Sequence, residues 1–342
     1  MDDFEAHLNA ILRSARIRGK LVVLCEGPRL AQRDVGRAPS PQTYRRQERL
    51  PDSSFYRRCI PHSWRDGLPR FFNCGDRSAV LRTYEALIER HRADPASSYL
   101  SLEKLYALVD LDVQAQSMPA DYPFPDTELI HHDLYRAGRV TKDIDSRHRI
   151  WVTALIHKEA YFVLPPACRC VFDRPSAEQP SAPLLNGTPL TLAGFCEQAV
   201  SRIQPGRDES DQDLASHFAT CSSRIEAFAA ALNLNTDDHE QLAATMQAAH
   251  ASANYHDDSC ADLIAALFSV TKAKPIWRQI SPPKDANGGL SDADYRDQLA
   301  LVIATEISKL EDSDHPLARF FSYLKRRHES GGGGGSVSTA AP

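Results

Sequence analysis

The sequence has no apolar run long enough to cross a membrane and no recognisable secretory leader. Its apolar runs are short, as at 21–25 and 151–156, whereas a membrane-spanning helix needs about 20 apolar residues. The first residues, Met-Asp-Asp-Phe-Glu, are acidic and lack the basic start of a secretory signal. These absences predict a cytoplasmic protein with no membrane partner.

The sequence also lacks the spacing patterns of two common kinds of site. Among its eight cysteines the only close pair is Cys168 and Cys170, and their one-residue spacer is too short for a zinc knuckle. Without a secretion signal, the cysteines are expected to be reduced thiols. No Gly-x-x-x-x-Gly-Lys-Ser/Thr loop is present. We therefore expect no ATPase activity from this chain, and any nucleotide switch would have to come from a partner.

One long stretch of the sequence contains no lysine and is nevertheless strongly basic. The chain as a whole is nearly balanced, with 40 Lys and Arg against 45 Asp and Glu. Residues 27–82 contain twelve arginines, no lysine and five acids, so this stretch has a net charge of +7 and the remainder −12. Arginine binds phosphate oxygens in a bidentate way. The stretch is either a nucleic-acid contact or a loop whose arginines pair with the acidic body. The candidate nucleic-acid contacts are Arg29, Arg45, Arg46, Arg49, Arg57 and Arg58.

The first half of the chain alternates short apolar runs with helical periodicity. The predicted strands are 20–25, 70–75, 105–110 and 149–156, and the predicted helices are 3–18 and 78–91. Strands separated by helices favour a parallel sheet and an α/β fold. Residues 27–68 are polar and arginine-rich, which predicts a basic insertion within an α/β domain at 1–170.

The second half has a different texture. Residues 171–189 are rich in proline and serine and predict a linker, and 190–329 predict an α-helical domain because Ala, Leu, Gln and Glu are frequent there. The predicted helices are 190–204, 211–232, 238–252, 258–271, 291–312 and 315–328. The glycine-rich end, 330–342, predicts a flexible tail.

Acidic residues stand where the predicted strands end. Glu26 follows the first strand, Asp110 and Asp112 follow the third, and Glu159 lies soon after the fourth. Because side chains alternate along a strand, Asp110 and Asp112 should point to the same side. Ligands of open α/β sheets bind beyond the carboxyl ends of the strands. Carboxylates that meet there need a cation to offset their repulsion, and hard Mg²⁺ or Mn²⁺ suits oxygen ligands.

Two of these segments resemble the Toprim family, the catalytic domain shared by topoisomerases, bacterial primases and overcoming-lysogenization-defect (OLD) nucleases. Leu21-Val-Val-Leu-Cys-Glu26-Gly27 resembles its glutamate motif, and Tyr106-Ala-Leu-Val-Asp110-Leu-Asp112 its Asp-x-Asp motif. The segments Phe71-Phe-Asn-Cys-Gly75-Asp76 and His157-Lys-Glu159-Ala-Tyr161-Phe resemble its glycine turn and the downstream segment of nuclease-type members. The resemblance covers about residues 18–166 and is closest in layout to PARIS-type effectors paired with an ATPase.

The resemblance implies a Toprim-like domain and a Mg²⁺- or Mn²⁺-dependent nuclease that cuts DNA or RNA in anti-phage defence. It implies metal ligands at Glu26, Asp110, Asp112 and Glu159, and a phosphate contact at Lys158. It also implies an ATPase as a possible partner. A homodimer is a further expectation, because symmetric dimers are the commonest assemblies. A topoisomerase is disfavoured because no separate DNA-gating domain with a tyrosine nucleophile is identified.

Several alternatives stay open beside this interpretation. Glu26 and Asp110 are 84 residues apart, more than two strand–helix units require, and Glu26-Gly27 is followed by Pro-Arg-Leu rather than by a further acid. Asp110 and Asp112 could be ordinary capping or loop carboxylates, and Asp76 is an outside candidate for a further ligand. The chain could instead be a non-catalytic docking or regulatory subunit of a defence complex. A phosphotransferase acting on a small nucleotide is disfavoured because the phosphate loop is missing.

Overall fold

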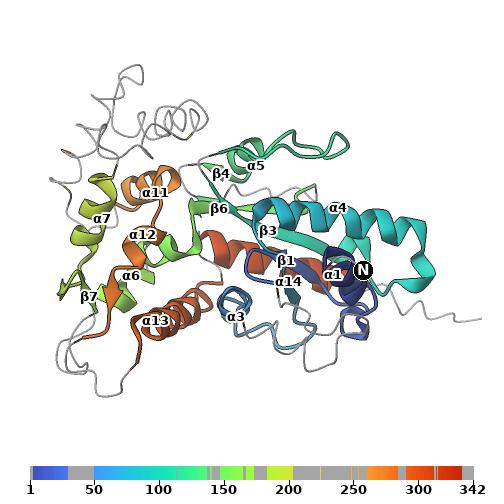
Figure 1. The fold of residues 1–342 in the computed structure, drawn as a ribbon, viewed down its shortest axis with the longest axis horizontal. Coiled ribbons are helices and arrows are strands. Elements are labelled where there is room, and N and C mark those ends of the chain that lie inside the picture. The colour runs from blue at the N-terminus through green and yellow to red at the C-terminus, as the bar shows by residue number, and fades with distance from the viewer. Residues whose placement is uncertain are drawn as a thin grey trace, which may run out of the picture. The chain divides into compact units, whose positions relative to one another are not determined.

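A computed structural model gives the fold, in which the chain forms two compact units. The first unit contains Met1–Ala107 and Ile307–Pro342, and the second contains Leu108–Glu306. The residues described are 3–29, 50–112, 114–136, 139–140, 147–164, 167–172, 183–202, 224, 248, 253, 260–283, 290–311, 313 and 315–332. Figure 1 shows the elements in chain order by colour.

The central element of the fold is a four-stranded parallel sheet with the strand order β2-β1-β3-β6 (Figure 1). Its strands are β1 (Val22–Cys25), β2 (Arg70–Asn73), β3 (Leu105–Leu111) and β6 (Ile150–Ile156). Strands β1 and β6 are buried at every residue. Continuous burial of this kind is expected when both faces of a parallel sheet are covered. The boundary between the two units falls inside β3.

The first unit covers its strands with helices from both ends of the chain. Helix α1 (Asp3–Leu12) packs on α4 (Arg77–Ala93), α4 packs on β1, and α3 (Pro51–Arg58) packs on β2. Asp76 caps α4 by accepting a hydrogen bond of 2.8 Å from the Ala79 amide. This contact assigns Asp76 a capping role, which is the ordinary role of aspartate before a helix.

Helix α14 (Pro316–Gly332), the last helix described, also belongs to the first unit. Its Phe321 ring lies 6.2 Å from that of Phe71 in β2, and its Tyr323 ring lies 6.3 Å from that of Tyr106 in β3. All four rings are buried, so residues from the end of the chain complete a core that begins at its start.

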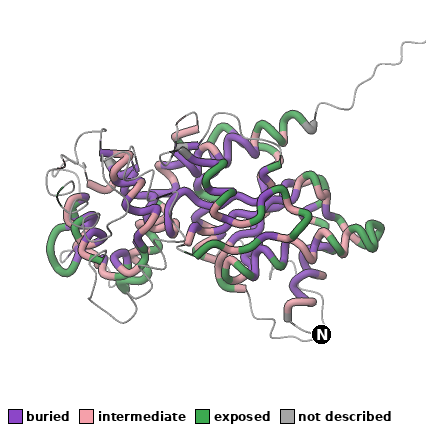
Figure 2. The backbone as a smooth tube through the Cα atoms, turned by 90° about the horizontal axis from the view of Figure 1, so that it is seen from above, coloured by how far each residue is buried: buried purple, intermediate pink, exposed green. Residues whose placement is uncertain are grey.

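The second unit is built around β6. Helices α5 (Thr127–Leu134) and α11 (Ala261–Val270) both pack against this strand, and α7 (Leu192–Val200) packs on α11 and α12 (Lys274–Trp277). Helix α6 (Ala167–Phe172) packs on the 3₁₀ helix η4 (Lys158–Val163). The Phe162 ring contacts those of Phe195 at 4.7 Å and Trp277 at 5.3 Å, forming an aromatic core. Figure 2 shows buried residues gathered in the interior and exposed residues on the outer turns of the backbone.

The remaining elements are short apart from α13. Strands β7, β8 and β9 form a small antiparallel sheet of order β8-β7-β9, and β4 pairs with β5. Their bounds are β4 (Tyr135–Arg136), β5 (Arg139–Val140), β7 (Leu184–Leu185), β8 (Thr188–Pro189) and β9 (Ile280–Ser281), and the other helices are α13 (Asp292–Ile307), η1 (Ala15–Ile17), η2 (Pro95–Ser97) and η3 (Leu102–Lys104). In the described part of the chain, no helix has the length and apolar character needed to cross a membrane.

The α/β fold with a parallel sheet is confirmed, and several details differ from the sequence expectations. The helix predicted at 3–18 ends at Leu12, and the stretch predicted as a basic insertion contains α3. The predicted linker at 171–189 contains β7 and β8, and the predicted helical domain at 190–329 contains β9, so that domain is not purely helical. Helix α14 continues to Gly332, into the predicted tail. The helices predicted at 211–232 and 238–252 lie outside the described residues, apart from Arg224 and Ala248.

The domain boundary predicted near residue 170 was based on a change in amino-acid composition. The two compact units are instead defined by which residues pack together. The second unit begins within β3 and includes most of the predicted helical half, while α14 joins the first unit. The division into a catalytic domain and a helical domain therefore stays a prediction.

Candidate metal and phosphate site

Glu26 stands at the turn that follows β1, where it is half-buried. Gly27 and Gly75 exchange two backbone hydrogen bonds of 2.9 Å, so the turns after β1 and β2 are joined. Gly27 has φ +130°, and an added Cβ would lie 2.6 Å from both Asn73 Nδ2 and Asp52 Oδ2. Only glycine meets both demands. The Glu26-Gly27 motif thus fixes the backbone beside the glutamate.

Polar groups from β2 and α3 support this turn. Asn73 is fully buried, and its Oδ1 accepts hydrogen bonds from Cys25 Sγ at 3.2 Å and from Ser53 Oγ. The Asp52 carboxylate, which reaches Gly27 from the first turn of α3, is an acid that the sequence interpretation did not single out. The signal for it was present, since proline followed by aspartate is typical of a helix start.

Asp110 and Asp112 occupy the end of β3 and the position just after it. Asp110 is half-buried in a strand whose other residues are buried, and the amide of Leu111 donates a hydrogen bond of 2.7 Å to Thr153 Oγ1 of β6. The alternation along a strand predicts that both carboxylates point to the same side. Glu26 belongs to the first unit and the two aspartates to the second. Their convergence stays a prediction from the strand order.

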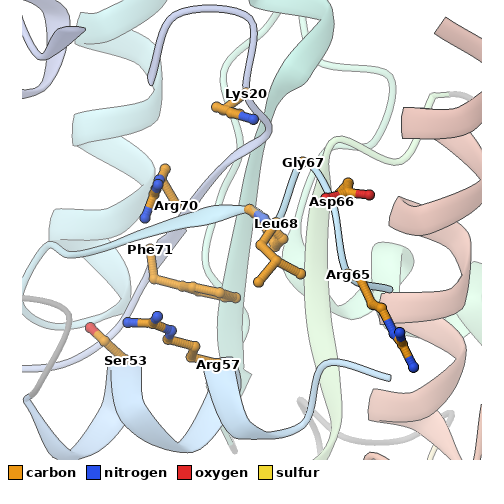
Figure 3. A pocket seen from close by; sticks show the side chains of 10 residues that line it. Lys20, Ser53, Arg57, Arg65, Asp66, Gly67, Leu68, Arg70 and Phe71 are labelled. Atoms are coloured by element: carbon orange, nitrogen blue, oxygen red, sulfur yellow. The ribbon is translucent and has the colours of Figure 1, made fainter. Parts of the chain in front are cut away.

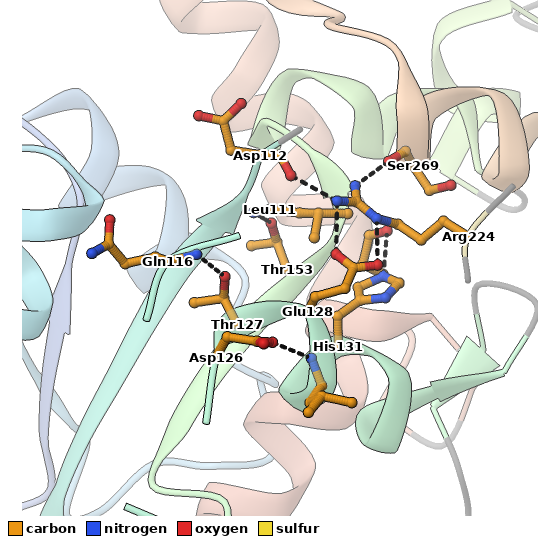
Figure 4. Close-up of polar contacts among 12 residues, drawn as sticks. Leu111, Asp112, Gln116, Asp126, Thr127, Glu128, His131, Thr153, Arg224 and Ser269 are labelled. Atoms are coloured by element: carbon orange, nitrogen blue, oxygen red, sulfur yellow. Dashed lines mark hydrogen bonds and ion pairs between the residues drawn. The ribbon is translucent and has the colours of Figure 1, made fainter. Parts of the chain in front are cut away.

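A buried arginine holds the backbone of Asp112 in place (Figure 4). Arg224, only 4% exposed, donates from Nη2 to the main-chain oxygen of Asp112 at 2.8 Å and from Nη1 to that of Ser269 at 2.5 Å. Its Nε donates to Glu128 Oε1 at 3.0 Å, and Nη2 pairs with Glu128 Oε2 at 2.8 Å. The guanidinium therefore connects the end of β3 with α5 and α11.

The chain that follows Asp112 is also attached to α5. Two hydrogen bonds join Gln116 and Thr127. The main-chain amide of Gln116 donates to Thr127 Oγ1 at 2.9 Å, and the main-chain amide of Thr127 donates to the main-chain oxygen of Gln116 at 3.0 Å. Asp126 caps α5 by accepting a hydrogen bond of 2.8 Å from the Leu129 amide (Figure 4). Contacts on both sides thus restrain the backbone around the second aspartate.

His157, directly after β6, has an unusual backbone. Its φ is +70° and its ψ is +143°, a region that side-chain-bearing residues rarely adopt. Its buried Nδ1 has no hydrogen-bond partner among the described residues. Such conformations cost about 1–3 kcal/mol and cluster at functional sites. The structure therefore singles out His157, which the sequence interpretation included only as part of a longer segment.

Charged groups of both signs surround His157. Burial lowers its pKa, the carboxylates of Glu159 and Asp112 act to raise it, and the ammonium groups of Lys274 and Lys272 act to lower it. The packing agrees with this, because α12, which begins at Lys274, contacts η4, which follows His157. Lys272 and Lys274 are exposed on either side of a buried alanine. The sequence interpretation missed both lysines, which come from the predicted helical half.

Tyr161 is a core residue of this region. It is fully buried, and its hydroxyl accepts a hydrogen bond of 2.9 Å from the Ala154 amide of β6. Burial raises its pKa far above the ordinary range, and the nearby Asp110 raises it further. Tyr161 therefore stays neutral and structural.

The chemistry of the predicted ligands suits a hard divalent cation, because all four are carboxylates near strand ends. Within the described residues, however, no three His, Cys, Asp or Glu side chains form a group that could hold a metal ion. Sharing of one ion by Glu26, Asp110, Asp112 and Glu159 therefore stays a prediction based on strand order.

Three of the six candidate nucleic-acid arginines lie in the described part of the chain. Arg29 lies 6.0 Å from the Phe4 ring, and its charge, after burial, helps to lower the pKa of His7 to about 4. Arg57 and Arg58 are exposed in the last turn of α3. Arg45, Arg46 and Arg49 lie outside the described residues.

Comparisons with known proteins give no family assignment: no family model, no curated protein and no solved structure matches this chain. The resemblance to the Toprim family therefore depends on the motifs themselves and on their places beside the parallel strands.

Proposed function

We propose that this protein is a metal-dependent nuclease that hydrolyses phosphodiester bonds in DNA or RNA. One observation carries the proposal: acidic residues follow β1, β3 and β6, which are neighbours in an all-parallel sheet. The carboxyl ends of such strands are where ligands of open α/β sheets bind. The resemblance to nuclease-type Toprim proteins points to the same residues.

In this proposal the metal ligands are Glu26, Asp110, Asp112 and Glu159. A bound Mg²⁺ or Mn²⁺ would supply an activated water and stabilise charge on the phosphate. The chain itself would hold the substrate through the ammonium groups of Lys158, Lys272 and Lys274. Attraction of this kind weakens as salt rises.

The resemblance to effectors that are paired with an ATPase extends the proposal to a biological role. We propose that the nuclease acts in anti-phage defence and that the partner supplies nucleotide control. The missing phosphate loop in this chain supports that division of labour.

The test is to incubate the purified full chain with plasmid DNA, total RNA and tRNA in Mg²⁺, Mn²⁺ or EDTA, and to size the products. Cleavage that needs a divalent cation and is lost with EDTA supports the nuclease. No cleavage of any of these substrates with either metal would overturn it.

A non-catalytic docking or regulatory subunit is the second candidate. It is favoured by the lack, in the part of the chain that the structure describes, of three metal-binding side chains gathered in one place. Partner binding that survives alanine substitution of the acids, without any cleavage activity, would support this function instead.

A further inference from the structure

A basic pocket lies in the first unit, at the amino ends of β1 and β2. It has a volume of ≈ 250 Å³, and the side chains that line it include four cations, Lys20, Arg57, Arg65 and Arg70, and one acid, Asp66. Figure 3 shows that these charged residues come from separate segments. Lys20 lies two residues before β1, Arg57 lies in α3, Arg65 and Asp66 lie in the loop before β2, and Arg70 begins β2.

The walls of this pocket are fixed by packing. Trp64 Nε1 donates a hydrogen bond of 2.8 Å to the Asp66 carbonyl, and Gly67, at φ +71°, lies directly against the His328 ring of α14. On the other side, Arg70 is paired in register with Val22 of β1, and the Phe71 side chain is buried. The backbone that carries the four cationic side chains is therefore fixed by these contacts.

The charge of the lining selects an anion. Four cations and one carboxylate give the lining a net charge of +3, and a bound anion would offset part of that charge. The side chains of Lys20 and Arg65 have no polar contact with any other described residue, so they are available to a ligand. Guanidinium groups bind phosphate oxygens in a bidentate way, which makes phosphate the best match.

The size of the pocket limits what enters it. A water molecule takes about 30 Å³ of liquid volume, so there is room for a phosphate group and its nearest waters. Whole small-molecule ligands usually occupy about 300–1,000 Å³. The pocket therefore suits one phosphate of a larger chain better than an entire nucleotide.

The position of the pocket separates it from the candidate metal site. Strand β1 has four residues between the pocket end and the Glu26 end, and a strand rises about 3.3 Å per residue, so the two ends are about 13 Å apart. A nucleic-acid strand rises about 3.4 Å per nucleotide. About four nucleotides would span that distance.

We propose that this pocket binds a backbone phosphate of the nucleic acid, away from the bond that is cut. The pocket anchors the substrate and does not take part in the chemical step. The choice of nucleic acid as the ligand rests on the proposed function, whereas the anion-binding character rests on the pocket itself.

The test measures binding by the full chain in EDTA, so that no cleavage is needed. Fluorescence anisotropy with labelled duplex RNA and duplex DNA oligonucleotides, over a salt series, gives the slope of log affinity against log salt. We expect Lys20→Gln/Arg57→Gln to reduce that slope by about 0.9, since the pocket holds one phosphate and each lost phosphate contact removes about 0.9. The matched control, Arg13→Gln/Arg92→Gln, removes two exposed cations of the same unit outside the pocket and should leave the slope unchanged.

Each other outcome has a definite meaning. An unchanged slope in the pocket variant, or an equal loss in the control, overturns the phosphate anchor. If the double variant fails to fold by circular dichroism, the single change Arg57→Glu at an exposed helix position takes its place. A second arm adds inorganic phosphate and adenosine monophosphate at matched ionic strength. Saturable binding of these alone, abolished by the pocket variant while oligonucleotide binding is unchanged, makes the pocket a site for free nucleotides and overturns the backbone assignment.

Failure of the phosphate site and failure of the nuclease give different results in these measurements. A chain that binds oligonucleotides through the pocket and never cuts them would overturn the nuclease and leave the anchor. If the chain cuts in Mg²⁺ and the pocket variant has an unchanged salt slope, the nuclease stands and the phosphate anchor is overturned.

Discussion

Arg224 donates a hydrogen bond of 2.8 Å to the main-chain oxygen of Asp112, although 112 positions separate the two residues in the sequence. The same guanidinium is paired with Glu128, whose side chain is 14% exposed. The backbone beside a predicted metal ligand is therefore held by a residue that is distant in the sequence but belongs to the same unit.

We expect Arg224→Met to destabilise the protein by about 3–5 kcal/mol, because it leaves the Glu128 carboxylate buried without its cation. Denaturant unfolding of the variant measures this loss. The double change Arg224→Met/Glu128→Gln should recover part of the stability, because the unpaired charge is then gone. Equal stability of the single variant and the parent would contradict the buried pair.

Replacing the acids at the strand ends should reduce activity far more than stability. We expect Glu26→Ala and Asp110→Ala/Asp112→Ala each to lower cleavage by about 10²- to 10³-fold, because loss of one group that stabilises charge at the reacting phosphate typically costs that much. The melting temperatures should stay the same or rise, since carboxylate repulsion is relieved without metal. Full activity in both variants would show that the assignment is wrong.

Substitutions at His157 should reverse the usual order of alanine and glycine. Glycine normally destabilises a regular position by about 0.5–1 kcal/mol relative to alanine. At φ +70° and ψ +143°, alanine keeps the backbone strain and glycine removes it. Denaturation should therefore find His157→Gly more stable than His157→Ala by about 1 kcal/mol or more. The normal order would mean that this backbone conformation is not retained.

Acid should destabilise the second unit through His131. Burial, and after it the charge of Arg224, lowers the pKa of this histidine to about 3. Below pH 6.5 the unfolded chain binds a proton that the folded chain refuses until about pH 3, so stability falls as the pH drops through that window. The loss is about 2 kcal/mol at pH 5. Unfolding of His131→Gln as a function of pH should show a smaller loss, while His132→Gln, at an exposed neighbour, should behave like the parent.

Charge removal in the basic stretch should act on binding rather than on chemistry. Arg45→Gln/Arg46→Gln/Arg49→Gln should weaken nucleic-acid binding and flatten its salt dependence, with a smaller effect on the rate at saturating substrate. Anisotropy titrations and single-turnover cleavage separate the two effects. Complete loss of activity here, with fully active carboxylate variants, would favour a binding module over a nuclease.

The strands of the sheet could be predicted because each is a short apolar run next to a turn residue. Helix α3 was missed since its eight residues contain many polar side chains, and its apolar face consists mainly of Phe55 and Tyr56. Its start was nevertheless marked by Pro51 and Asp52, which are typical of a first helical turn.

Long-range partners left no local signal. Arg224 lies in a stretch with ordinary helical composition, and nothing near it in the sequence indicates Glu128 or Asp112 as partners. Lys272 and Lys274 were missed for the same reason, because only folding brings them near His157. The positions of Glu26, Asp110, Asp112 and Glu159 at or near strand ends could be predicted because strand ends can be recognised from sequence, whereas their role as ligands stays a prediction.

The contribution of α14 to the first unit has a consequence for biosynthesis. Chains emerge from the ribosome amino end first, but the rings of Phe71 and Tyr106 meet those of Phe321 and Tyr323, which are translated more than 200 residues later. Until then, part of the apolar surface of β2 and β3 has no cover. The core of the first unit can therefore be completed only after the whole of the second unit has been synthesised, because residues 108–306 lie between its two parts in the chain.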